Sequence, residues 1–279
     1  MMEQGIEFLK GHGTENDFVL LPDPTGRLEL TPSRVRALCD RHCGLGADGV
    51  LRAVPGALVS DAPPGTSSED WFMDYHNADG SLAELCGNGM RVFTRYLIDA
   101  RLVADPEFRI GSRSGSRAVR GNDDGSVTVE MGRVRCYGTS TVTVEGVAFS
   151  GLVVDVGNPH LVCLTEIPVE QLDLAVPPGH DPGAFPHGVN VEFVNERCAG
   201  ELWMRVHERG VGETRSCGTG TVAVVAAALE AQGRDIGEAT VQAPGGRLHV
   251  VITKDGSTLT GPAVLVAWGR LAFEWWAAH

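Results

Sequence analysis

Two cysteines in this chain stand in the same local context. Cys86 and Cys217 each begin the sequence Cys-Gly-X-Gly, and each precedes an apolar segment with a helical pattern. A thiol at a helix N-terminus lies near the positive end of the helix dipole and near unpaired backbone N–H groups, which lowers its pKa. The glycines leave those N–H groups accessible, so the same turn can bind a carboxylate. One such turn is typical of a nucleophile or an anion site.

The similarity extends well beyond the cysteines. Residues 75–89 and 206–220 both begin as a strand, contain a His ten residues before the cysteine, and cross a glycine-containing loop before Cys-Gly-X-Gly. The two cysteines are separated by nearly half the length of the 279-residue chain. Self-similarity on this scale predicts two related domains. We expect the two cysteine turns to face one cleft between the domains, which is a common location for small-molecule sites.

Two thiols around one cleft indicate proton transfer at carbon. Racemisation needs a base on one face of the carbon and an acid on the other, and a thiolate/thiol pair supplies both. Many enzymes use pyridoxal phosphate as the electron sink for this chemistry, but neither Lys10 nor Lys254 has the context of a Schiff-base lysine. We therefore expect an amino-acid racemase or epimerase without cofactor or metal. Preorganised N–H donors would stabilise the carbanion charge on the substrate carboxylate.

The elements that must position these motifs are many short strands and few helices, which indicates a mixed α/β fold. Gly, Pro and Asp turns separate the strands. The pattern predicts strands at 127–131, 141–144, 152–156, 189–194, 202–207 and 248–253, and helices at 31–41, 88–100 and 219–232. Thr31 suits the N-cap of the first helix and Pro32 suits its first turn.

Composition narrows the class of protein. The formal net charge of −13 disfavours nucleic acid and anionic membranes as partners. No targeting segment is visible, and the apolar run at 222–229 is too short to span a bilayer. We therefore expect a cytoplasmic protein.

The number and spacing of the cysteines also fit a cytoplasmic protein. The seven cysteines are odd in number and irregular in spacing, so reduced thiols are expected. Cys39, His42 and Cys43 form a weak metal-like pattern, but packing at a helix end is the better interpretation. Cys136, Cys163 and Cys198 are interpreted as ordinary packing residues.

At this point the sequence resembles the diaminopimelate epimerase family. Six motifs match in order along nearly the whole chain, at 10–18, 40–49, 77–91, 157–160, 189–191 and 208–220. Proline racemases of the same superfamily typically have Gly-His after the first cysteine, whereas Gly87-Asn88 follows Cys86 here. The resemblance implies interconversion of LL- and meso-diaminopimelate, in lysine and peptidoglycan precursor biosynthesis.

The resemblance also implies the architecture. Two pseudo-symmetric α/β domains are expected, each a β-barrel-like mixed sheet around a central helix, with the active site in the cleft between the domains. The N-terminal domain would comprise 1–132, with 264–279 returning to it, and the C-terminal domain would comprise 133–263. Family members are commonly homodimers, so a homodimer is expected.

The resemblance further implies residue roles. The acid–base thiols would be Cys86 and Cys217, with His160 and Glu208 steadying them. Backbone N–H groups of Gly87, Asn88, Gly218 and Thr219 would bind the carboxylate at the reacting carbon. The distal carboxylate and its stereocentre would be bound by Asn77, Asn158, Asn190 and Arg209 with Asn16 beside them, and Glu208 would also accept a hydrogen bond from a substrate ammonium.

Two departures and two alternatives accompany this interpretation. Glu15 stands where the family often has Gly, and Gly49 stands where it often has a substrate-contacting Gln. A proline or hydroxyproline racemase would leave Arg209 and the Asn cluster without a second carboxylate to bind. A non-catalytic amino-acid-binding protein would need neither Cys86 nor Cys217.

Overall fold

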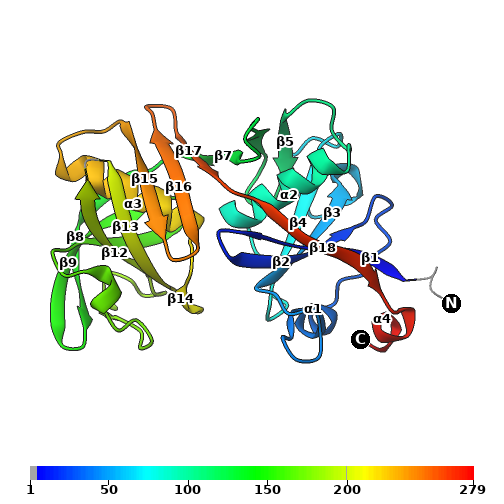
Figure 1. Ribbon diagram of the computed structural model, residues 1–279, viewed down its shortest axis with the longest axis horizontal. Helices are drawn as coiled ribbons and strands as arrows, with labels where there is room; N and C mark the ends of the chain where they lie inside the picture. The colour runs from blue at the N-terminus through cyan, green and yellow to red at the C-terminus, as the bar shows by residue number, and fades with distance from the viewer. Residues whose placement is uncertain (1–4, 199) are drawn as a thin grey trace. The chain divides into compact units, whose positions relative to one another are not determined.

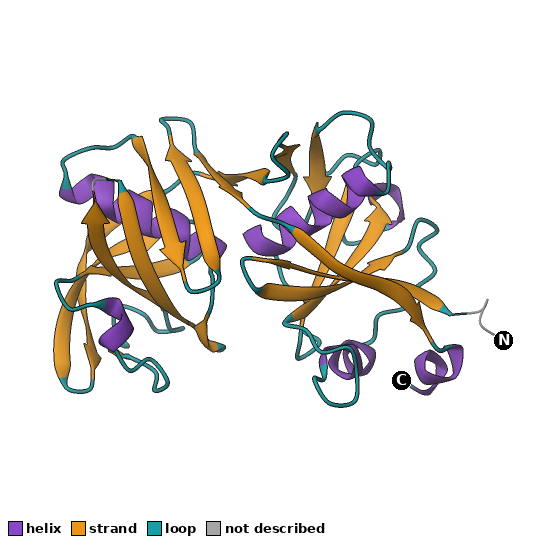
Figure 2. Cartoon of the chain, in the orientation of Figure 1, coloured by secondary structure: helices purple, strands orange, loops and turns teal. Residues whose placement is uncertain are grey.

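The computed structural model describes residues 5–198 and 200–279. The chain forms two compact units, unit 1 comprising Met1–Val129 with Pro262–His279 and unit 2 comprising Glu130–Gly261. Each unit is a curled mixed sheet around one long helix (Figures 1 and 2). The mixed α/β fold class expected from the sequence is confirmed. No helix among the described residues is long and apolar enough to cross a bilayer.

In unit 1, neighbouring strands are antiparallel except for the parallel pairs β2/β3 and β4/β5. Their order is β18 (Val264–Leu271), β1 (Ile6–Gly13), β2 (Asn16–Pro22), β3 (Gly49–Pro55), β4 (Trp71–Asn77), β5 (Glu107–Gly111), β6 (Arg117–Gly121) and β7 (Val127–Gly132). The long helix α2 (Gly87–Asp99) contacts β18, β1, β2, β3 and β6, so the sheet curls around it. The helices α1 (Pro32–Cys39) and α4 (Phe273–Ala278) and the 3₁₀ turn at Gly56–Leu58 complete the unit.

In unit 2, the parallel pairs are β10/β12 and β13/β15, and the other neighbours are antiparallel. The order is β8 (Arg135–Val144), β9 (Val147–Asp155), β10 (Pro159–Leu164), β12 (Asn190–Cys198), β13 (Glu201–Glu208), β15 (Gly237–Ala243), β16 (Gly246–Ile252) and β17 (Ser257–Gly261). The helix α3 (Gly218–Ala231) lies against this sheet. Two short strands, β11 (Gly179–His180) and β14 (Gly212–Thr214), pair with β8 and β13, and Val169–Gln171 is a 3₁₀ turn.

The two strand orders repeat one pattern of directions. In both units, two antiparallel pairs are followed by a parallel, an antiparallel, a parallel and two antiparallel pairs. The strand β18, from the end of the chain, therefore takes the place in unit 1 that β8 takes in unit 2. The repeat seen around the two cysteines is thus part of a repeat of the whole fold.

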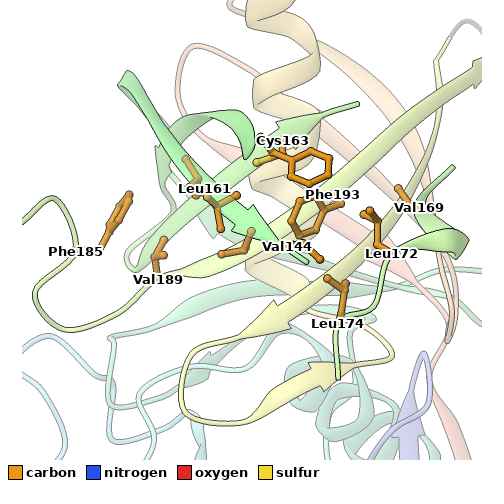
Figure 3. Close-up of a cluster of buried hydrophobic side chains, with 12 residues drawn as sticks. Val144, Leu161, Cys163, Val169, Leu172, Leu174, Phe185, Val189 and Phe193 are labelled. Carbon is orange, nitrogen blue, oxygen red and sulfur yellow. The ribbon is translucent and has the colours of Figure 1, made fainter. Parts of the chain in front are cut away.

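The core of unit 2 shows how alternation sorts side chains between the two faces of the sheet. Leu161 and Phe193 point into a buried apolar cluster, where Phe149 meets the Phe193 ring edge-on at 5.0 Å (Figure 3). Successive strand residues point to opposite faces. His160 of β10 and Glu192 of β12 therefore face away from this cluster, and Glu192 lies against the first turn of α3.

The expected elements agree closely with the structure. Thr31 caps α1 by accepting a hydrogen bond from the Arg34 amide at 3.2 Å, and Pro32 begins the helix. The helices expected at 88–100 and 219–232 each begin one residue earlier, directly after the cysteine.

One departure from the family pattern, Glu15, lies in the hairpin turn between β1 and β2. The two turn residues, Thr14 and Glu15, both have positive φ angles, of 51° and 62°. A two-residue turn of this type matches the twist of antiparallel strands and favours Gly at its second position. The chain keeps the turn although Glu15 occupies the position that suits Gly.

Candidate functional site

In unit 1, the polar residues expected from the motifs lie together at one end of the strands of the sheet. We call this end of the strands the polar edge of the unit. The register pairs Phe18 with Gly49 and Gly49 with Asn77, so the starts of β2 and β3 and the end of β4 lie together. Asn16 and Asn77 stand at this edge, and Cys86, which directly precedes α2, stands nine residues after Asn77.

Cys86 is the N-cap of α2. Its Sγ accepts a hydrogen bond from the Gly89 amide at 3.3 Å and lies 3.6 Å from Asn16 Oδ1. The same Asn16 oxygen accepts from Asn88 Nδ2 at 3.2 Å. Asn16 Nδ2 donates to Asp48 Oδ2 at 2.8 Å, which fixes the amide with its oxygen toward the cysteine. The structure therefore brings Asn16, Asn88 and Cys86 together, and Asp48 orients them.

The predicted residue Asn77 occupies the same edge, beside Gly49, which is one of the two departures from the family pattern. Asn77 Nδ2 donates to Ser81 Oγ at 3.0 Å, which ties the end of β4 to the turn that leads toward Cys86. A side chain at Gly49 would begin 2.7 Å from both the Tyr75 ring and the His76 carbonyl oxygen. The Tyr75 ring thus occupies the space into which a residue larger than Gly49 would extend.

Unit 2 places its predicted residues at the equivalent edge. The register pairs His160 with Asn190 and Val191 with His207, so the starts of β10 and β12 and the end of β13 lie together. Asn158 precedes β10, and Glu208 ends β13 nine residues before Cys217. Asn158 and Glu208 thus correspond in the fold to Asn16 and Asn77.

Cys217 is the N-cap of α3, as Cys86 is of α2. Its Sγ accepts from the Gly220 amide at 3.4 Å and lies 3.5 Å from Thr219 Oγ1. Thr219 Oγ1 also accepts from Asn158 Nδ2 at 3.4 Å. The remaining predicted binding position, Gly218, is the first residue of the helix.

A polar relay runs from Asn158 into the interior of unit 2. Asn158 Oδ1 lies 3.0 Å from His160 Nε2, and His160 Nδ1 lies 2.7 Å from Glu192 Oε1. His160 and Glu192 are both fully buried. Glu192 is not among the residues expected from the sequence, although alternation along β12 places it on the same face as Asn190.

The electrostatic setting of Cys217 differs from the sequence expectation. Burial raises the pKa of the Cys217 thiol well above its ordinary value, and the neighbouring carboxylates Glu208 and Glu192 raise it further. Hydrogen bonds from Thr219 and the Gly220 amide oppose this pKa shift without overcoming it. The expected lowering of the pKa is therefore wrong for Cys217, because desolvation and two like charges outweigh the helix N-terminus.

Glu208 forms the other half of this arrangement. Burial raises its pKa, while hydrogen bonds from Thr214 and from Cys217 lower it. The two groups thus act on each other: Cys217 lowers the pKa of Glu208, and the Glu208 carboxylate raises the pKa of Cys217.

Arg209 directly follows the end of β13, beside the polar residues of unit 2. Its backbone N–H donates to Asn190 Oδ1 at 2.9 Å, and its Nη1 donates to the His187 carbonyl oxygen at 3.3 Å. The side chain is exposed. Its guanidinium therefore has capacity to bind a further anion.

The residues of the weak metal-like pattern belong to packing and surface. Cys39 is buried in the core beside α1, and burial raises its pKa to about 12, whereas Cys43 is exposed. Over residues 5–198 and 200–279, no group of three or more His, Cys, Asp or Glu side chains is arranged to hold a metal ion.

Comparison with known proteins identifies the family. The family model described as diaminopimelate epimerase matches residues 8–137 and 152–266. A relative from Rhodococcus opacus, named diaminopimelate epimerase, is 55% identical over 97% of this chain and 99% of its own length. A relative of the same name from Mycolicibacterium gilvum is 54% identical over 98% of this chain and all of its own length.

Solved structures show the same fold at low sequence identity. A Bacillus anthracis phenazine biosynthesis protein of the PhzF family superposes with a TM-score of 0.74 at 15% identity, covering 97% of this chain and 100% of its own. A hydroxyproline epimerase from Agrobacterium vitis gives 0.66 at 17% identity, covering 98% and 94%. The resemblance seen in the sequence motifs is confirmed: the chain is an isomerase and belongs to the diaminopimelate epimerase family.

Proposed function

We propose that this chain interconverts LL- and meso-diaminopimelate, with Cys86 and Cys217 as the acid–base pair. The observation that carries the proposal is that each cysteine N-caps the long helix of its unit at an equivalent point of a repeated strand framework. The names of the relatives supply the substrate class.

The chemistry follows from a thiolate and a thiol on opposite faces of one carbon. The thiolate removes the α-proton, the thiol delivers a proton to the other face, and the reverse reaction exchanges the roles. This proposal includes a cleft between two domains, 1–132 with 264–279 and 133–263, into which both cysteine turns project.

Carbanion formation needs stabilisation at the reacting carboxylate. Helix N-termini offer backbone N–H groups and a positive dipole end, and each cysteine turn supplies two such donors. In the proposed complex these donors are the backbone N–H groups of Gly87, Asn88, Gly218 and Thr219. Fixed donors in a dry cleft provide this stabilisation without a cofactor.

The polar edges bind the rest of the substrate in this proposal. Arg209 suits planar, bidentate binding of the distal carboxylate. The amide groups that read the distal stereocentre are those of Asn77, Asn158 and Asn190, with Asn16 beside them. Glu208 accepts from a substrate ammonium and, with His160, steadies the thiol at Cys217.

The proposal also covers assembly and cellular role. The edge strand β18 pairs only with β1 among the described strands and exposes Val264, Val266 and Trp268, the last by 85%. An apolar row on a sheet edge is a common protein–protein contact. We place the homodimer contact on this row and the enzyme in the cytoplasm, serving lysine and peptidoglycan precursor synthesis.

The experiment is exchange of solvent deuterium into added LL-diaminopimelate, with chiral separation of the products. The wild-type enzyme, dialysed against chelator, should incorporate deuterium at the α-carbon and form the meso isomer. Cys86→Ala and Cys217→Ala should each abolish epimerisation, whereas Cys136→Ala, which removes an exposed thiol, should retain full activity. Substantial turnover by either active-site variant would contradict the two-thiol mechanism.

A further inference from the structure

One buried cation is left without a role by the mechanism above. Arg91, on the second turn of α2, is completely buried. Its guanidinium donates to Thr14 Oγ1 at 3.0 Å, to the Gly87 carbonyl oxygen at 3.4 Å and to the Pro262 carbonyl oxygen at 3.1 Å. All three acceptors are electrically neutral.

A buried charge is normally paired with an opposite charge, because desolvation is otherwise very costly. Within the described residues, no carboxylate forms an ion pair with Arg91. Arg52 and Arg113 provide the contrast, since each is largely buried in unit 1 and each pairs with aspartates. The counter-charge of Arg91 must therefore come from a group that is not a carboxylate.

The ionisable groups near α2 are the candidates for this counter-charge. The strands packed against the helix carry these charged or titratable residues: Glu7, Lys10, His12, Asp17, Arg52, Arg117, Arg120 and Arg270. Burial lowers the pKa of Arg91 to about 10, and the one group that acts against this shift is Cys86. At neutral pH the guanidinium is therefore still charged, and a thiolate at Cys86 would be its counter-ion.

The packing holds the guanidinium at the cysteine turn. It bonds Gly87, the residue directly after Cys86, and Thr14, which in turn bonds Asn88 at 3.4 Å. A side chain at Gly13 would begin 3.0 Å from Arg91 Nη2 and 2.8 Å from the Asn88 carbonyl oxygen. Close packing on this side keeps the cation under the Cys86–Asn88 turn.

We propose that Arg91 is a positioning residue whose guanidinium stabilises the Cys86 thiolate, so that the resting enzyme holds Cys86 as base and Cys217 as acid. The inference rests on the proposed two-thiol function and assigns its protonation states. The thiol of Cys86 releases its proton to water, and the resulting negative sulfur offsets the buried cation. Unit 2 has the opposite arrangement, because Val222 stands five residues after Cys217 and carboxylates surround that thiol.

The test separates charge from packing with two variants that both keep N–H donors on an unbranched side chain. Arg91→Lys keeps a cation and Arg91→Gln does not, and Arg95→Gln, which changes a partly exposed arginine on the same helix, is the matched control. Alkylation by iodoacetamide is followed against pH without substrate, and peptide mapping gives the rate at each cysteine. Circular dichroism and thermal unfolding report whether each variant is folded.

We expect Arg91→Gln to raise the apparent pKa of Cys86 by roughly 1–3 pH units, the usual effect of a close opposite charge. At neutral pH, Cys86 alkylation would then slow by about tenfold or more, because each unit is a tenfold change in thiolate fraction. Arg91→Lys should retain most of the wild-type rate. Arg95→Gln should match the wild type, and alkylation of Cys217 should not change in any variant.

Equal behaviour of the folded Lys and Gln variants would overturn the proposal, since it would make Arg91 a packing residue. Wild-type Cys86 provides a test that needs no variant: an apparent pKa at or above the ordinary thiol value of about 8.5 would also overturn it. These titrations contain no substrate. Failure of the deuterium experiment therefore refutes the proposed function without affecting them, and an unperturbed Cys86 refutes this inference alone.

Discussion

Asp74 of β4 lies at the centre of a buried network of charged side chains, and removing its charge should lower the stability of the fold. Asp74 Oδ1 lies 2.6 Å from Arg113 Nη1 and 3.0 Å from His76 Nε2, and Asp74 Oδ2 lies 3.3 Å from Arg52 Nε. Asp74 stands three residues before Asn77, so the network anchors the strand end that carries part of the proposed site. The perturbation is Asp74→Asn, which removes the charge at nearly constant volume.

The magnitude follows from the pKa and from the partners that remain. Burial alone would raise the pKa of Asp74, but hydrogen bonds and charges from His76 and Arg113 hold it at about 2, below the ordinary 3.8. A difference of this size corresponds to about 2 kcal/mol of stabilisation at neutral pH. Breaking a buried pair costs about 3–5 kcal/mol. We expect about 3 kcal/mol for Asp74→Asn, because Asp23 still lies 3.7 Å from Arg52 and Asp61 still lies 3.3 Å from Arg113.

The direction of the Asp74 pKa shift determines how the stability difference between wild type and variant changes with pH. A carboxyl group whose pKa is lower in the folded state stabilises the fold above its unfolded pKa, and this contribution is lost as pH falls through the folded pKa. The stability gap between wild type and variant should therefore be constant above about pH 5 and should narrow by roughly 1 kcal/mol at pH 3. Asp17, whose pKa is also about 2, titrates in both proteins, so the difference isolates Asp74.

The assay is urea unfolding of both proteins at pH 7, 5 and 3. Asp99→Asn is the control, because Asp99 forms an exposed pair with Arg95, and such pairs contribute less than about 1 kcal/mol. A loss below about 0.5 kcal/mol for Asp74→Asn at pH 7, the range of an ordinary surface substitution, would show that the buried network does not stabilise the fold as expected. A gap that does not change with pH would show the same.

Three further predictions concern the proposed site and assembly. Arg209→Met removes charge-assisted hydrogen bonds of about 1.5–3 kcal/mol to the distal carboxylate, so kcat/KM for diaminopimelate should fall by roughly ten- to a hundredfold. Substrates without that carboxylate should lose little further, and an equal loss on both would show that Arg209 acts elsewhere. Glu208→Gln removes a carboxylate that raises the pKa of Cys217, so thiolate absorbance titrations should show a lower pKa for Cys217; an unchanged or higher value would mean that the lost Glu208–Cys217 contact matters more than the charge. Trp268→Glu places a charge in the exposed row on β18. Sedimentation equilibrium should show a dimer for the wild type, as proposed, and a monomer for the variant; a variant that remains dimeric would move the contact away from β18.

Features that depend on local backbone chemistry could be predicted from the amino-acid sequence. The Cys-Gly-X-Gly turns predicted two helices, and each begins directly after its cysteine, because an N-cap followed by glycines is a local signal. Thr31 and Pro32 likewise located the start of α1. The repeat around the cysteines predicted related halves, and the strand directions repeat in both units.

The charges that surround each thiol, in contrast, depend on how distant parts of the chain pack together. Two cysteines in nearly identical turns have opposite neighbours, since the cation of Arg91 lies under one turn and the carboxylates of Glu208 and Glu192 lie beside the other. Arg91 is close to Cys86 in the sequence. Its burial and its neutral partners Thr14 and Pro262, however, depend on segments far along the chain. Coulomb interactions and desolvation act through space and depend on which groups are buried together. The upward shift of the Cys217 pKa therefore follows from the packing of β12 and β13 around α3, which the local sequence does not encode.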